Sequence, residues 1–105
     1  MLSGHQRIDS RSLAFGRAIA EKLRTKPELV ELARENIRRW MPTVSERTQP
    51  ALQEWLTALD GPIEGVIALL TSEDERATRL RQSNPFAGAL SQEERNAILR
   101  QFAIS

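Results

Sequence analysis

The residues able to act as bases, nucleophiles or metal ligands are few and poorly placed for catalysis. The chain of 105 residues contains one histidine, His5, and no cysteine, so no second nitrogen or sulfur ligand exists to share a metal ion with His5. Serine and aspartate without a positioned base make no activated nucleophile. The lack of cysteine also excludes disulfides and thiolate chemistry. We therefore expect a protein that is not an enzyme and needs no metal or other cofactor.

Two acidic clusters remain as candidates for acid–base chemistry. Residues 73–75 read Glu-Asp-Glu, and Glu93 is followed by Glu94. Each cluster lies where a helix is expected to begin, and the helix dipole favours negative charge there. The five glycines are scattered and form no phosphate-binding loop. Both acidic clusters are therefore interpreted as signals for the start of a helix.

Arginines beside an apolar, turn-rich segment give the most specific indication of function. Residues 79–91 read RLRQSNPFAGALS, which is too apolar for an ordinary surface loop and too rich in turn residues for a helix interior. Arginine next to an aromatic side chain is typical of a protein-binding hot spot. The predicted partner-binding residues are Arg76, Arg79, Arg81, Gln82, Ser83, Asn84 and Phe86.

The same segment has a second, purely structural interpretation. In it Phe86 folds back into the core as a plug, and Glu75 pairs with Arg79 one helical turn away. Arginines late in a helix also complement the negative end of its dipole. Both interpretations stay open at this point.

A basic N-terminal part raises nucleic-acid binding as an alternative function. Residues 1–40 hold nine Lys or Arg against five Asp or Glu, whereas residues 41–105 hold six against nine. The predicted phosphate contacts are Arg34, Arg38 and Arg39. Interleaved glutamates offer a self-paired, solvated face as the other interpretation. A helix-turn-helix with a recognition helix after residue 73 is disfavoured, because the acidic residues 73–75 would meet DNA phosphates.

Helix signals recur along the chain, and strand signals are absent. Capping boxes are predicted at residues 25–28, 72–75 and 91–94, and Gly16 is expected to weaken the first helix slightly. Pro42 to Thr48 should form an exposed, mobile connection. Helices are expected over residues 10–25, 26–41, 48–59, 73–83 and 92–103, with a further one after Gly61-Pro62 that carries residues 63–70.

These elements predict an all-α fold: a compact single domain of five to six short helices around a central αα-hairpin. Residues 1–8 are expected to form a flexible N-terminal arm, and residues 9–105 the helical domain. Trp55 should anchor the hairpin. The predicted hairpin core is Leu52, Trp55, Leu56, Leu59, Ile63, Val66, Ile67 and Leu70.

Residues 79–88, followed by Leu90-Ser91-Gln92-Glu93-Glu94-Arg95, resemble small bacterial helical antitoxins of toxin–antitoxin operons. The resemblance covers about the last third of the chain and, more faintly, residues 9–40. It implies a non-enzymatic inhibitor that sequesters a companion, toxin-like enzyme, with DNA-binding regulation of its own operon as the alternative. No run approaches the roughly 18 apolar residues that span a membrane, and no signal peptide is evident. A cytoplasmic location is expected, without a membrane partner, and self-association stays open.

Overall fold

Amphipathic segments separated by proline, glycine and capping residues build a structure made of helices alone. The computed structural model describes residues 4–102, with side chains from residue 10 onward, and that part of the chain contains six helices and no strand. They are α1 (Gly4–Thr25), α2 (Leu29–Trp40), α3 (Gln49–Leu59), α4 (Ile63–Thr71), α5 (Glu75–Arg81) and α6 (Gln92–Arg100). The predicted all-α class is confirmed.

The first helix is longer than its sequence signals indicate. α1 begins at Gly4 rather than near residue 10, so residues 4–8 of the expected arm are helical. Residues 1–3 lie outside the described part of the chain, as does the side chain of His5. The connection at residues 42–48 is largely exposed, as predicted.

One of the predicted capping boxes forms as expected, at the start of α6. The Ser91 hydroxyl accepts a hydrogen bond from the Glu94 backbone N–H at 3.1 Å, and the Glu94 carboxylate accepts one from the Ser91 N–H at 2.7 Å. These two bonds satisfy donors that the helix itself leaves unpaired. They fix where the chain turns into α6.

The other two predicted boxes are wrong. Thr25 is the last residue of α1 and does not cap the next helix. Its hydroxyl donates back to the Lys22 carbonyl at 3.2 Å, and α2 starts only at Leu29. At the start of α5 the cap is Asp74, whose carboxylate accepts the Ala77 N–H at 2.7 Å, while Ser72 donates to Asp74. The Ser72 hydroxyl also accepts the Asp74 backbone N–H at 3.2 Å, so the N-cap lies two residues later than the predicted box places it.

Gly16, expected only to weaken the first helix slightly, has a packing role where α1 crosses α4. A Cβ atom at this position would overlap the Leu70 carbonyl oxygen of α4. The lack of a side chain lets the two backbones touch. α4 consequently packs more extensively on α1 than on α3, its predicted hairpin partner.

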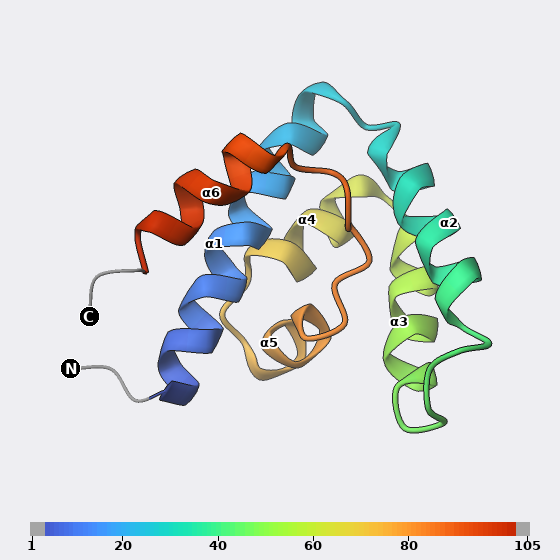
Figure 1. The fold of residues 1–105 in the computed structure, drawn as a ribbon. Coiled ribbons are helices and arrows are strands. Elements are labelled where there is room, and N and C mark those ends of the chain that lie inside the picture. Colours follow the sequence, from blue (N-terminus) through green and yellow to red (C-terminus); the bar gives the residue numbers. More distant parts are fainter. Residues whose placement is uncertain (1–3, 103–105) are drawn as a thin grey trace.

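The core is centred on α4 and α5, with the other helices around them. Figure 1 shows α6 lying across α1 on one side and the α2–α3 pair on the other. From the predicted hairpin, Leu52, Trp55, Leu59, Val66 and Leu70 are buried, whereas Leu56, Ile63 and Ile67 are partly buried at its edge.

Candidate functional site: a basic cleft beside the 82–91 segment

The 82–91 segment is built into the core. Phe86 is 3% exposed, and its ring meets that of Trp55 edge-on with the centroids 6.2 Å apart. The Trp55 indole N–H donates to the Leu80 carbonyl at 2.8 Å, which ties α3 to the end of α5. The structural interpretation of Phe86 is therefore confirmed, and its predicted role as an exposed partner anchor is wrong because the ring is buried among core side chains.

Hydrogen bonds from α2 fix the backbone of the same segment. The buried Asn36 amide donates to the carbonyls of Pro85 and Ala87, both at 2.9 Å. The Asn84 side chain accepts the Phe86 N–H at 2.9 Å, and Gly88 has a φ of +90°, a conformation that favours glycine. The segment is a rigid wall rather than a mobile loop, because its polar backbone groups are held from several sides.

Arg81 is also part of the architecture. This side chain is 5% exposed, and one terminal nitrogen donates to the carbonyls of Leu69 at 2.9 Å and Ser72 at 2.7 Å. Carbonyls at the end of α4 thus receive a charged donor, which suits the negative end of a helix. The prediction that Arg81 is exposed for a partner is wrong, because it caps α4 from inside.

The other predicted contact residues divide between two places. Arg79 is exposed on α5 and pairs with Glu54 of α3 at 3.2 Å, and Arg76 is exposed nearby. Gln82 and Asn84 instead line a cleft, together with parts of Arg81 and Phe86. Ser83 is half-buried and is not among the residues that line this cleft.

The predicted nucleic-acid arginines do not form one free patch. Arg34 donates to the Leu59 carbonyl at 2.6 Å and lies 3.3 Å from the Asp60 carboxylate, so it joins α2 to the end of α3. Arg39 donates to the Asn36 side chain at 2.7 Å. Arg38 is exposed and makes no ion pair among the described residues. Two of the three side chains therefore serve the fold.

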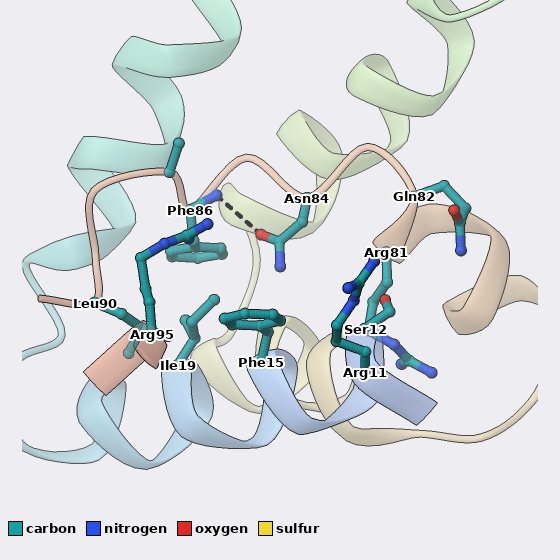
Figure 2. Close-up of a pocket in the computed structure, with 11 residues that line it drawn as sticks. Arg11, Ser12, Phe15, Ile19, Arg81, Gln82, Asn84, Phe86, Leu90 and Arg95 are labelled. Carbon is teal, nitrogen blue, oxygen red and sulfur yellow. Dashed lines mark hydrogen bonds between the residues drawn. The ribbon is translucent and has the colours of Figure 1, made fainter. Parts of the chain in front are cut away.

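The cleft lies between α1, α6 and the 82–91 segment and has a volume of about 300 Å³. Figure 2 shows its lining side chains, with Phe15 on the floor between Arg95 and the pair Arg11 and Arg81. The lining comprises Arg11, Ser12, Phe15 and Ile19 from α1, Arg95 from α6, and residues from the stretch 81–90.

Positive charge over an apolar floor defines the chemistry of this cleft. The Arg95 guanidinium carbon lies 5.2 Å from the centre of the Phe15 ring, within range of a cation–π contact. None of the described side chains that line the cleft is acidic. The arrangement can hold an anionic group at its rim and an apolar group on its floor.

Sequence reasoning missed the α1 and α6 walls of the cleft. Arg11 and Phe15 are one helical turn apart, a spacing that places them on one face of α1, but nothing in the local sequence indicates that this face borders a cleft. Arg95 lines the cleft only because α6 folds back over α1, which brings its guanidinium over the Phe15 ring. No local signal in the sequence predicts that approach.

An ion pair fixes the α6 wall. The Lys22 ammonium of α1 donates to the Glu94 carboxylate at 2.6 Å and to the Ala89 carbonyl at 3.1 Å. The hydrogen bonds from Lys22 and from the Ser91 N–H lower the pKa of Glu94 to about 2. Glu94 is thus a structural carboxylate that joins α1 to α6, which agrees with its interpretation as a helix-start signal.

No protein-family model, curated protein or solved structure matches this chain. Among the residues that the structure describes, no three His, Asp or Glu side chains group closely enough to hold a metal ion. No helix in that part of the chain is long and apolar enough to cross a membrane.

Proposed function

We propose that this protein is a non-enzymatic binding module that recognises a companion protein through the basic cleft. The observation that carries this proposal is the cleft itself: an aromatic floor at Phe15, arginines at the rim, and a wall held rigid by Asn36 and Trp55. Rigid aromatic and arginine side chains in a preformed hollow are the usual composition of interface hot spots.

The companion is most concretely a toxin-like enzyme that the protein sequesters in the cytoplasm. This part of the proposal rests on the resemblance of residues 79–95 to small bacterial antitoxins, a stretch that supplies both the wall of the cleft and Arg95. DNA binding is the second candidate. It has less support, because Arg34 and Arg39 make hydrogen bonds to other residues of the fold. Of the three predicted phosphate contacts, only Arg38 makes no such bond to another described residue.

Site-specific crosslinking in the source cell tests the proposal. A photoreactive phenylalanine analogue replaces Ser12, which lines the cleft, and in a control it replaces Glu64, an exposed residue of α4. We expect one protein species to be captured from position 12 and not from position 64. Equal capture from both positions, or capture of nucleic acid alone, would contradict the proposal.

A further inference from the structure

Two arginines at the rim of the cleft carry positive charge that a ligand can reach. Arg11 and Arg95 are both exposed, and neither makes an ion pair or a hydrogen bond to another described residue. This contrasts with Lys22, Arg34 and Arg79, each of which has a carboxylate partner. An unpaired guanidinium at the mouth of a hollow is suited to a carboxylate, with which it makes charge-assisted hydrogen bonds.

The apolar floor adds a second requirement on the ligand. Phe15 and Ile19 of α1 meet Phe86 and Leu90 of the opposite wall in the interior of the cleft. A volume of about 300 Å³ is room for one large side chain rather than for a helix. Arg95 is already oriented by the Phe15 ring, so less side-chain freedom is lost when it binds.

From this arrangement we propose that the cleft binds an acidic segment of a partner protein, with an apolar or aromatic side chain entering between Arg11 and Arg95 and flanking carboxylates pairing with the two guanidinium groups. The inference rests on the proposed function, since it specifies the chemistry of the segment that the cleft accepts.

A nucleic-acid strand fits the same charges less well. Nucleic-acid sites extend along several phosphates, whereas the arginines here surround one hollow and the chain as a whole carries a net charge of only +1.

The test uses two peptides that differ only in charge. One is acetyl-Glu-Glu-Phe-Glu-Glu-amide and the other has glutamine in place of each glutamate, and both are titrated into the full chain while its amide NMR signals are followed. We expect the acidic peptide to shift signals around Phe15 and Arg95 and to bind at least about tenfold more tightly than the glutamine peptide. The Arg11→Gln/Arg95→Gln variant should lose that preference, whereas Arg38→Gln, which changes an exposed arginine of α2, should retain it.

The results that would overturn the acidic-segment proposal can be told apart from a failure of the proposed protein-binding function. Equal affinity for the two peptides would overturn the acidic-segment proposal while leaving the cleft as a site for protein segments. No shift around Phe15 with either peptide would overturn it too, and the crosslink from position 12 would then decide the proposed function separately. Displacement of the acidic peptide by a ten-residue thymidine oligonucleotide at equal concentration would overturn it in favour of nucleic acid.

Discussion

Phe86 meets Trp55 edge-on in the centre of the protein, with the ring planes inclined at 78°. Trp55 is fully buried, and its indole N–H bonds to the carbonyl of Leu80 at 2.8 Å. The aromatic residue that looks most like a partner anchor in the sequence is therefore the residue that fastens the last third of the chain to α3. The proposed binding surface is therefore the cleft lined by Arg11, Phe15 and Arg95, and the Phe86 ring serves mainly as its support.

Replacement of Phe86 by alanine should mainly affect stability. We expect Phe86→Ala to lower the free energy of unfolding by about 3–5 kcal/mol, the usual cost of removing a buried phenylalanine ring. Urea unfolding followed by tryptophan fluorescence measures it. Arg79→Ala is the control and should cost less than about 1 kcal/mol, because its ion pair with Glu54 is exposed to solvent. Similar unfolding midpoints for the two variants would contradict the burial of Phe86.

A pair of glycine substitutions tests the crossing of α1 and α4. Gly16→Ala should be strongly destabilising, because the added Cβ overlaps the Leu70 carbonyl and the helices must separate. Gly65→Ala is the matched control: its Cβ would meet nothing within 4 Å, so the higher helix propensity of alanine should stabilise the protein by up to about 1 kcal/mol. Thermal unfolding by circular dichroism should show opposite shifts. A neutral effect of Gly16→Ala would refute the close approach.

The Lys22–Glu94 pair predicts a loss of stability in acid. The pKa of Glu94 is lowered from an ordinary value near 4.5 to about 2, so the stabilisation is complete above pH 4.5 and disappears as the pH falls towards 2. Glu94→Gln should therefore have a lower melting temperature than the unaltered protein at pH 6, and the difference should shrink on acidification. Asp74, whose pKa is lowered by the bond from the Ala77 N–H, titrates in both proteins and cancels in the comparison. A difference that is constant between pH 6 and pH 2 would contradict the ion pair.

The remaining DNA-binding alternative makes a narrow prediction about Arg38. If Arg38 contacts a phosphate, Arg38→Gln should reduce the slope of log affinity against log salt by about 0.9, the value for one contact. Arg34→Ala should instead lower the free energy of unfolding, because it removes the link between α2 and the Leu59 carbonyl. Fluorescence anisotropy with a labelled duplex at low salt measures the first effect. No detectable binding by the unaltered protein would end this alternative for the isolated chain.

The helical class and most of the core could be predicted from the sequence, because both depend on the spacing of apolar residues and on proline, glycine and capping residues within single segments. Trp55 of α3 and Val66 of α4 are buried, as the spacing of their apolar faces indicates. Ser91 caps α6, as predicted. The predicted box at residues 72–75 failed because Ser72 bonds to Asp74, and the Asp74 carboxylate caps the helix by accepting the Ala77 N–H. Spacing alone does not decide which of two neighbouring polar residues becomes the cap.

The candidate site could be predicted only in part, because it depends on contacts between distant segments. Gln82 and Asn84 were identified, and both line the cleft. Whether Arg81 faces solvent or the end of α4 is decided by how α4 packs on α5, which no local pattern encodes. Arg95 reaches Phe15 only through the fold-back of α6 over α1.

The most direct test of the cleft as the binding surface is the affinity of the captured companion protein for two tryptophan variants. Ser12→Trp fills the cleft, whereas Ser45→Trp adds the same side chain to the exposed 42–48 connection. With both variants melting close to the unaltered protein, calorimetric titration should show at least about 30-fold weaker binding for Ser12→Trp, equivalent to about 2 kcal/mol, and no change for Ser45→Trp. Unaltered binding by a folded Ser12→Trp variant would contradict the assignment of the cleft.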